Sequence, residues 1–352
     1  MNRRALRRAC TLRGVASLEN LFRAATLARR GKSRRPDVET WWHHRESELG
    51  RLSQEMSAGT WRPGGYRTFF IHEPKRREIS AAPFADRVVH HALCLRLAPL
   101  LQRRFIARSY SCQVGKGTQL ARDCCRQLVN RHRYVLKCDV WKFFPNLDHA
   151  SISRLLARDV RCGGIMALCG HILASHRTGP ELPAALFPGD DLLTAVERPR
   201  GLPIGNLTSQ LWGNLALDPL DRWITEQQGH GSYLRYTDDF LLFSNDKGQL
   251  WDLRAGIVEQ LAAVRLRLAE PKSRLLACRE GVPFCGFLFR PGLQPRILGA
   301  TKRRFEARRE RYTAERDYAR LTQAVRAWYQ FSEEANSAGL RRAYATPRRS
   351  SP

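Results

Sequence analysis

The spacing of apolar residues alternates along the chain between a helical period and a strand period. Apolar positions on one helical face predict helices at 37–56, 86–105, 119–130, 211–226 and 250–268. Short aromatic and branched runs predict strands at 66–70, 134–139, 233–243 and 282–289, the last two as hairpins. The pattern therefore predicts a mixed α/β chain.

The two ends and one internal segment have a different composition. Residues 3–35 predict one basic helix with a polar linker at its end, and Asp37 is the predicted N-cap of the next helix. Residues 177–200 are rich in Pro and Gly and predict a loop-like surface insertion. Residues 301–344 are highly charged and predicted helical, and 346–352 predict a short disordered tail.

The most informative stretch is Y-L-R-Y-T-D-D-F-L-L-F at 233–243. Two apolar strands flank Thr237-Asp238-Asp239, a sequence that suits a tight turn. Carboxylates held rigidly at a hairpin tip can bind divalent cations. A solvated acidic turn explains this stretch equally well when it is taken alone.

Two further segments carry candidate chemistry. Asp139 ends the apolar strand Y-V-L-K-C-D, and a strand end is a natural place for a catalytic carboxylate. Lys75 and Arg77 belong to a basic turn between extended runs, where a guanidinium can bind a triphosphate, although a solvated charge run is an equally good interpretation. The glycine-hinged loop 115–118 lacks the spacing of a P-loop, so we do not predict a nucleotide-hydrolysing site there.

Charge narrows the class of ligand. The 352-residue chain has 60 Lys plus Arg against 33 Asp plus Glu, a formal net charge of +27, and is 43% hydrophobic. A globular chain with basic residues along its whole length suggests a broad polyanion-binding surface, most simply for nucleic acid. A membrane-surface protein is the competing interpretation, but the sequence has no apolar run long enough to span a bilayer and no secretory signal.

The cysteines and histidines do not predict a metal site. None of the ten Cys forms a C-x-x-C pair, and the ten His lack zinc-like spacing. Most of the Cys lie in apolar or helical contexts, which predicts reduced, partly buried thiols in a cytoplasmic protein.

Taken in order, these segments resemble the motifs of the reverse transcriptase family. Asp139, followed five residues later by Phe144, is similar to the first catalytic motif, and Tyr236-Thr237-Asp238-Asp239 is similar to the Tyr-x-Asp-Asp motif. Residues 201–210 resemble the motif between them. The remaining matches are Lys272 and Phe284-Cys285-Gly286-Phe287, similar to the last two palm motifs, and 75–87, similar to the fingers. The order and spacing, over positions 60 to 309, make the resemblance specific.

The resemblance implies a right-hand polymerase fold of the α/β (α+β) class, with a palm built on an antiparallel sheet plus helices. The implied boundaries are an N-terminal helical extension at 1–59, fingers at 60–132, a palm at 133–290 with the surface insertion at 177–200, a helical thumb at 291–345 and the tail at 346–352.

The implied activity is RNA-directed DNA polymerisation, a nucleotidyltransferase reaction that uses two Mg²⁺ ions. The implied metal ligands are Asp139, Asp238, Asp239 and the Val140 carbonyl, with Lys272 as the proton donor to pyrophosphate. The implied nucleotide-binding residues are Lys75, Arg77, Phe144, Ile204, Gly205 and Gln210, and the implied primer grip is Phe284, Cys285, Gly286 and Phe287. Phe144 is expected to exclude a 2′-hydroxyl, with a plain core aromatic as the alternative. The implied partners are template RNA, a DNA primer or cDNA, and deoxynucleoside triphosphates.

The central motif departs from most reverse transcriptases, which carry Gln-Gly-x-x-x-Ser-Pro. Ile204 stands in place of the Gln and Gln210 in place of the Pro, as in the enzymes of diversity-generating retroelements, relatives of the group II intron and retron enzymes. Those enzymes copy a template-repeat RNA with errors at adenines and work with a small basic helical-bundle accessory protein. No maturase, DNA-binding or endonuclease domain is predicted after the thumb, which argues against a full group II intron protein.

Two alternatives remain open from the sequence. One is another stand-alone bacterial or phage-encoded enzyme, of the retron or phage-defence type, with the same chemistry. The other is an inactive polymerase fold that binds RNA as a scaffold, which the presence of all three palm carboxylates disfavours.

Overall fold

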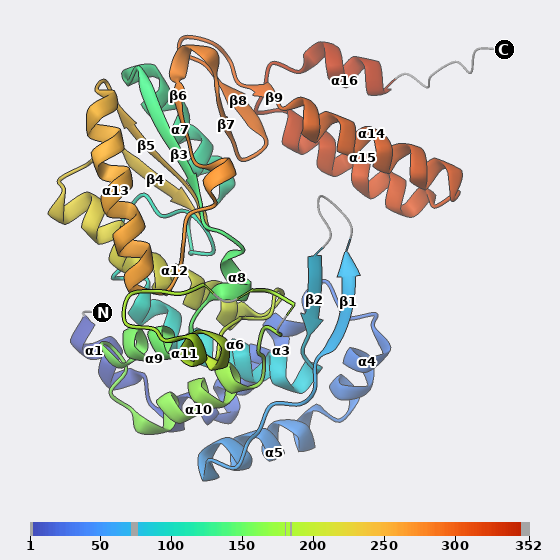
Figure 1. The fold of residues 1–352 in the computed structure, drawn as a ribbon. Helices are drawn as coiled ribbons and strands as arrows, with labels where there is room; N and C mark the ends of the chain where they lie inside the picture. Colours follow the sequence, from blue (N-terminus) through green and yellow to red (C-terminus); the bar gives the residue numbers. More distant parts are fainter. Residues whose placement is uncertain (1–2, 72–76, 180, 184, 346–352) are drawn as a thin grey trace.

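The computed structural model describes residues 3–71, 77–179, 181–183 and 185–345 (Figure 1). Its first part is helical. The helices are α1 (Arg3–Ala9), α2 (Leu12–Ala16), α3 (Leu18–Arg29), α4 (Pro36–His43) and α5 (Arg45–Ala58). The prediction of one basic helix over 3–35 was wrong, because the Thr11 and Ser17 side chains accept N-cap hydrogen bonds from Gly14 and Asn20 and begin new helices.

The next predicted boundary was also wrong. Asp37 is not an N-cap: it lies in the first turn of α4, because Pro36 occupies the first helical position, where its fixed φ is already helical. The predicted helix over 37–56 is divided at His44, which ends α4 and precedes α5. The apolar positions of both helices still face the core, since Val38, Leu52 and Met56 are buried.

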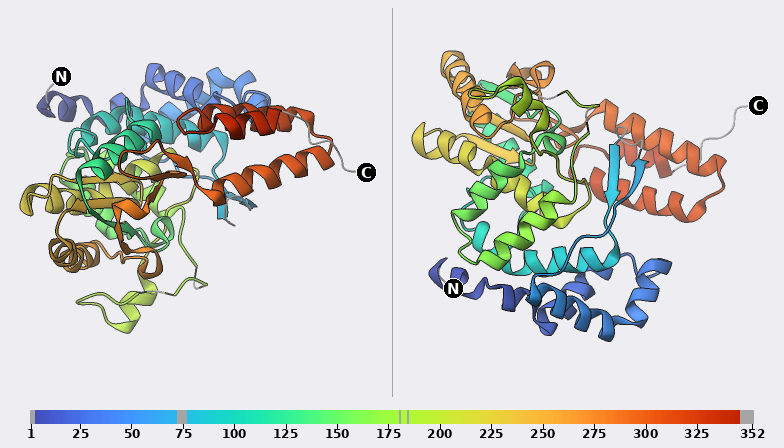
Figure 2. Two further views of the ribbon diagram at one scale, coloured as in Figure 1. Left: turned by 90° about the horizontal axis from the view of Figure 1, so that it is seen from above. Right: turned by 60° about the horizontal axis from the view of Figure 1, so that its bottom comes forward.

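A two-stranded hairpin and two long helices follow. The hairpin pairs β1 (Arg67–Ile71) with β2 (Arg77–Ala81), and it stands apart from the other sheets (Figures 1 and 2). The helices are α6 (Phe84–Leu101) and α7 (Thr118–Arg131). Every residue of β1 is exposed, so this hairpin is held at its base and not by a core of its own.

The central sheet is antiparallel, in the order β4 (Tyr233–Tyr236), β5 (Asp239–Ser244), β3 (Tyr134–Asp139) and β6 (Arg274–Ala277). Side chains alternate between its two faces. Val135, Leu241 and Phe243 pack against α7, whereas Leu136 and Leu242 pack in the cluster that includes α12 and α13. The predicted strand at 134–139 and the predicted hairpin at 233–243 are confirmed.

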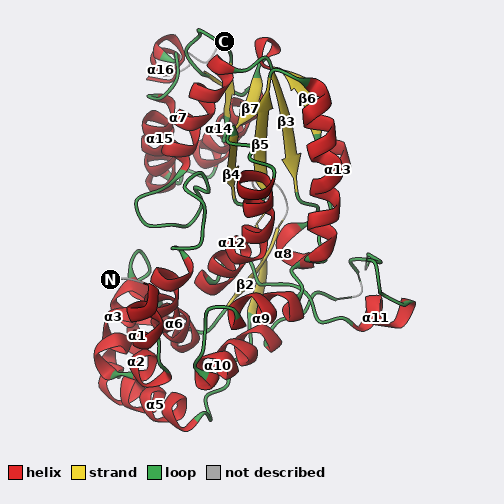
Figure 3. Cartoon of the chain, turned by 90° about the vertical axis from the view of Figure 1, so that its left-hand side faces the viewer, coloured by secondary structure: helices red, strands yellow, loops and turns green. Residues whose placement is uncertain are grey.

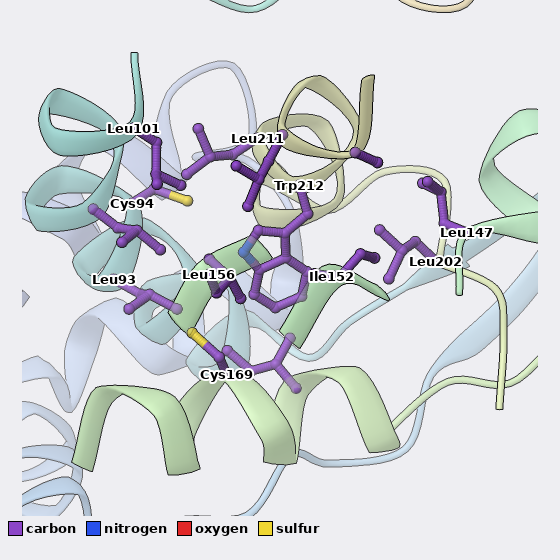
Figure 4. Close-up of a cluster of buried hydrophobic side chains, with 14 of the residues drawn as sticks. Leu93, Cys94, Leu101, Leu147, Ile152, Leu156, Cys169, Leu202, Leu211 and Trp212 are labelled. Carbon is purple, nitrogen blue, oxygen red and sulfur yellow. The ribbon is translucent and has the colours of Figure 1, made fainter. Parts of the chain in front are cut away.

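Between β3 and β4 the chain forms α8 (Phe143–Asn146), α9 (His149–Ala157), α10 (Gly163–Ala174), α11 (Leu192–Glu197) and α12 (Leu207–Arg222), which continues as a π-helical turn (Trp223–Gln227). After β5 it forms α13 (Lys247–Ala263), which packs beside β3 and β5. The predicted insertion at 177–200 is not wholly loop, because it contains α11, which projects from the body in Figure 3. Figure 4 shows Trp212 of α12 inserted among Leu93 of α6, Leu156 of α9 and Cys169 of α10, so these helices share one core.

The C-terminal part contains a small antiparallel sheet and a helical extension. The sheet is β7 (Val282–Phe284), β8 (Phe287–Phe289) and β9 (Arg296–Ile297), and the helices are α14 (Gly299–Ala314), α15 (Tyr318–Ser332) and α16 (Ala338–Ala345). We call α14 and α15 the C-terminal arm; the two helices run side by side away from the small sheet (Figure 1). Phe305 and Trp328 stack between them with ring centroids 4.3 Å apart.

The fold confirms the predicted mixed α/β class with antiparallel sheets. All ten Cys are free thiols, and seven of them are buried. No helix in the described ranges is both long and apolar enough to cross a membrane. The tail predicted at 346–352 lies outside the described residues.

Candidate active site

The three acidic residues singled out in the sequence meet at one end of the central sheet. Asp139 is the last residue of β3, Asp239 is the first residue of β5, and the two are direct register partners. Asp238 occupies the turn that joins β4 to β5, and its carbonyl accepts a hydrogen bond from the Val140 N–H at 3.3 Å. The strand register therefore places Asp139, Val140, Asp238 and Asp239 together.

Two lysines neutralise two of the carboxylates. Lys272 Nζ lies 2.5 Å from Asp139 Oδ1, and it reaches the site from the single turn Glu270–Lys272. Lys137 lies two residues before Asp139 on the same face of β3, and it forms an ion pair with Asp239. The sequence had pointed to Lys272 but not to Lys137, although a charged residue inside an apolar strand was the available signal.

Asp238 forms no ion pair with any described residue, and its pKa is raised to about 6. Burial is the main cause, and the neighbouring charge of Asp139 adds to it. Burial also raises the pKa of Asp239, with Lys137 opposing the shift. A cation beside Asp238 and Asp139 would remove the cost of holding two carboxylates close together in a buried site.

The donor set fits magnesium, because carboxylate and carbonyl oxygens are the ligands that this cation prefers. Asp139, Asp238 and the Val140 carbonyl would hold the ions, with Asp239 beside them. Among the residues that the structure describes, no three His, Cys, Asp or Glu side chains form a ready-made metal cluster. This agrees with the engagement of Asp139 and Asp239 by lysines, which a bound cation would have to displace or complement.

A buried ion pair, which we did not predict from the sequence, is hydrogen-bonded to the backbone of the acidic turn. Arg235 is fully buried, donates to both carboxylate oxygens of Asp221 on α12, and donates to the Thr237 carbonyl at 2.9 Å. Thr237 has φ +59°, an uncommon conformation for a β-branched residue, and its hydroxyl donates to Ser111 at 2.7 Å. This network holds the turn in a strained conformation, which is typical of functional sites.

Phe144 lies five residues after Asp139, in the short helix α8. It is partly buried, whereas its neighbour Phe143 is buried. Both rings lie against Gly213 of α12, where an added Cβ would be 3.1 Å from Phe143 and 3.4 Å from Phe144. The Phe144 carbonyl accepts a hydrogen bond from Leu202 at 2.9 Å. Phe144 is therefore positioned by its backbone and by α12 while part of its side chain remains accessible.

The segment predicted to contact nucleotide runs along the start of α12. Ile204 is partly buried, and Gln210 is exposed on the first turns of the helix. Gly205 has φ +125°, and a Cβ there would lie 3.7 Å from Ile79 of β2, so this glycine brings the segment against the β1–β2 hairpin.

The residues predicted to grip the primer, Phe284 to Phe287, form a tight hairpin. Phe284 and Phe287 are register partners of β7 and β8, and the turn between them has Cys285 at φ +43° and Gly286 at φ +88°. Two consecutive positive φ values are typical of a type I′ hairpin turn. Lys137, which pairs with Asp239, has its Nζ 5.8 Å from the ring centroid of Phe284, so the hairpin lies beside the acidic site.

Of the two residues predicted to bind the triphosphate from the β1–β2 hairpin, the structure describes only Arg77. Arg77 is exposed at the start of β2, and no ion pair joins it to the acidic site among the described residues. Lys75 lies outside the described residues.

Comparison with known proteins gives the family. A family model described as reverse transcriptase (RNA-dependent DNA polymerase) matches residues 72–290. That range is more than half of the chain, and the chain belongs to the reverse transcriptase family. It contains all of the acidic site, the central motif and the tight hairpin.

Two curated proteins are similar at lower identity. Protein YkfC of Escherichia coli (strain K12) is 23% identical, over 68% of this chain and 70% of that protein. The Putative COX1/OXI3 intron 1 protein of Saccharomyces cerevisiae (strain ATCC 204508 / S288c) is 22% identical, over 51% of this chain and 20% of that protein. This chain thus spans about a fifth of the length of the yeast protein.

Proposed function

We propose that this protein is an RNA-directed DNA polymerase that extends a DNA primer on an RNA template by two-metal phosphoryl transfer. One observation carries the proposal: Asp139 and Asp239 are register partners at the end of β3 and β5, with Asp238 in the adjoining turn. Two Mg²⁺ ions would neutralise charge on the triphosphate and on the attacking oxygen. The residues of the chain would supply rigid carboxylates and in-line positioning.

Further roles follow from the placement of the neighbouring residues. Lys272 is half exposed and close to Asp139, which suits a proton donor to the departing pyrophosphate. Arg77, with Lys75, would bind the triphosphate from the β1–β2 hairpin. Phe144 would lie under the incoming sugar and exclude a 2′-hydroxyl, and Ile204, Gly205 and Gln210 would border the nascent base pair.

The parts of the chain fit the roles of a right hand. We assign 60–132 as fingers, 133–290 as palm and 291–345 as thumb, which includes the C-terminal arm. The segment from Phe284 to Phe287 would grip the primer, because its turn lies beside the acidic site. Template RNA would contact the basic surface through phosphate groups, as the net charge of +27 favours.

We further propose that the enzyme belongs to a diversity-generating retroelement. The support is the central motif, where Ile204 and Gln210 replace the Gln and Pro of most family members. In that setting its partners would be a template-repeat RNA and a small basic helical-bundle accessory protein, and its cDNA would carry errors at template adenines.

Primer extension tests both levels of the proposal. The purified protein is given an RNA template, an annealed DNA primer, deoxynucleoside triphosphates and Mg²⁺, and the product is sequenced. DNA synthesis supports the polymerase, and errors concentrated at template adenines support the retroelement assignment. Accurate copying would leave a retron-type or phage-defence enzyme as the better assignment, and absence of synthesis would favour an RNA-binding scaffold.

A further inference from the structure

Arg122 lies where three parts of the chain meet. It belongs to α7, and its side chain reaches the tight hairpin of β7–β8 and the end of the C-terminal arm. The residue is only 8% exposed, and its Nε donates to the Thr118 carbonyl at 3.1 Å. Its guanidinium lies over the ring of Phe287 at 4.7 Å and over the ring of Phe331 at 5.5 Å.

The same guanidinium is also ion-paired to the arm. Nη1 lies 2.8 Å from Glu334 Oε2, two residues beyond the end of α15. The two rings beneath it, Phe287 of the hairpin and Phe331 of α15, have centroids 4.5 Å apart. One guanidinium therefore lies within ion-pair distance of a carboxylate and close to two aromatic rings, a combination that the compact ammonium of lysine does not reproduce.

The hairpin is shaped to accept this contact. Gly286 has φ +88°, and a Cβ at that position would lie 2.9 Å from Cζ of Phe331. Its carbonyl also accepts a hydrogen bond from Leu298, just before α14, at 3.0 Å. The turn of the hairpin thus contacts Phe331 of α15 and Leu298, the residue before α14.

We call the contacts of Arg122 with Phe287, Phe331 and Glu334 the joint, and one side of this joint borders a cavity. A cavity of about 260 Å³ borders Arg122 and Phe287 and is also lined by Arg126, Gln294 and Glu333. The Arg122 contacts therefore lie at the border of an open space and not inside a closely packed core.

The other side of the hairpin is held by a second cation. Lys137 Nζ lies 5.8 Å from the ring of Phe284, the register partner of Phe287, and the same ammonium pairs with Asp239. The hairpin is therefore bracketed between a cation paired with the acidic site and a cation paired with the arm.

We propose that Arg122 is a positioning residue that fixes the C-terminal arm against the Phe284–Phe287 hairpin. The joint controls how long the enzyme stays on its primer–template duplex, and not the rate of each nucleotide addition. Within the described ranges, no hydrogen bond or ion pair joins Arg122 to Asp139, Asp238 or Asp239. The inference rests on the proposed polymerase function, because it assumes that the arm and hairpin hold the primer–template duplex.

Arg122→Met tests the joint, with Arg126→Met as the matched control. Arg126 lies one turn further along α7, is exposed and borders the same cavity, so both variants remove one positive charge from the same helix. Product length is measured in the presence of a heparin trap, single-nucleotide addition is measured at saturating primer–template, and melting temperature is measured for each protein.

We expect Arg122→Met to raise the dissociation rate from primer–template by about fivefold or more, a change typical of losing one specific contact, and to shorten the products. Single-nucleotide addition should stay within about twofold of the parent, because the acidic site is untouched. Glu334→Gln, which leaves the ring stack intact on a partly exposed side chain, should shift product length in the same direction. This second variant keeps the test valid if Arg122→Met folds poorly.

Equal product lengths for Arg122→Met and Arg126→Met would overturn the proposal, because general charge would then explain the effect. A loss of single-nucleotide addition in Glu334→Gln at unchanged product length would also overturn it. If the unaltered chain adds no nucleotide at all, the failure lies in the proposed polymerase function, so the two failures are distinguishable.

Discussion

Asp139 and Asp239 face each other across β3 and β5 as register partners, and Lys137 on the same strand as Asp139 pairs with Asp239. One strand thus supplies both a candidate metal ligand and the cation that holds its neighbour. The pair lies on the sheet face that α7 and the β7–β8 hairpin cover, since Lys137 and Asp139 alternate with residues packed against α13. Strand register therefore positions Asp139 and Asp239, while the β4–β5 turn positions Asp238.

Lys137→Met should lower stability in metal-free buffer, because it leaves the carboxylate of Asp239 without its partner. A partly buried pair of this kind is expected to cost about 1–3 kcal/mol on loss of one partner. Adding Asp239→Asn should recover part of that loss, because the uncompensated charge disappears. Urea unfolding with EDTA measures both variants, and additive losses in the double variant would show that the pair does not couple.

Phe144 and Phe143 should behave differently when each is changed to Ala. Phe144→Ala should let the enzyme incorporate ribonucleotides at little cost to deoxynucleotides, because exclusion by bulk is lost. Phe143→Ala should instead lower the free energy of unfolding by about 3–5 kcal/mol, because its ring is buried. The ratio of ribonucleotide to deoxynucleotide incorporation is the measurement. An unchanged ratio for Phe144→Ala would return that residue to the core.

Burial of His90 should make the folded protein less stable in mild acid. Burial lowers the pKa of this histidine from 6.5 to about 3, and neighbouring His91 adds to the shift. The unfolded chain therefore binds a proton below pH 6.5 that the folded chain rejects, and stability falls as pH falls. The slope from this residue is about 1.4 kcal/mol per pH unit between roughly pH 6 and pH 4.

Urea unfolding across that pH range tests the effect. His90→Leu should reduce the slope by about that amount. An unchanged slope in His90→Leu would mean that other groups set the acid sensitivity.

Three strands of the central sheet, β3, β4 and β5, were predictable because they are short, apolar and bounded by turns, whereas β6 (Arg274–Ala277) was missed. The buried pair of Arg235 and Asp221 was not predictable, because it joins a strand to a helix across the fold and neither residue has a sequence signature. The contacts of Arg122 could not be predicted for the same reason, because they join a helix to a hairpin and to the C-terminal arm across the fold. The breaks in the N-terminal helices were readable in principle, since Thr11 and Ser17 are good N-caps, but the basic composition masked them.

Ile204→Gln tests the fidelity aspect of the retroelement assignment. If residue 204 borders the nascent base pair, as we propose, a Gln there would hydrogen-bond near the incoming nucleotide, whereas Ile has neither donor nor acceptor. One hydrogen bond contributes about 0.5–1.5 kcal/mol, which is up to about tenfold in discrimination. We expect fewer errors at template adenines, counted separately for each base. Parental error rates in an active Ile204→Gln variant would show that Ile204 does not set fidelity.

The most direct test of the account is DNA synthesis by Asp139→Asn and Asp238→Asn, measured together with RNA affinity. Each change removes a carboxylate charge that would hold a metal ion and leaves the basic surface unaltered. Asp252→Asn, on the exposed face of α13, is the matched control. The account predicts that both site variants lose primer extension, bind RNA nearly as tightly as the parent and bind Mg²⁺ more weakly, while Asp252→Asn behaves as the parent. Robust primer extension by either site variant would contradict it.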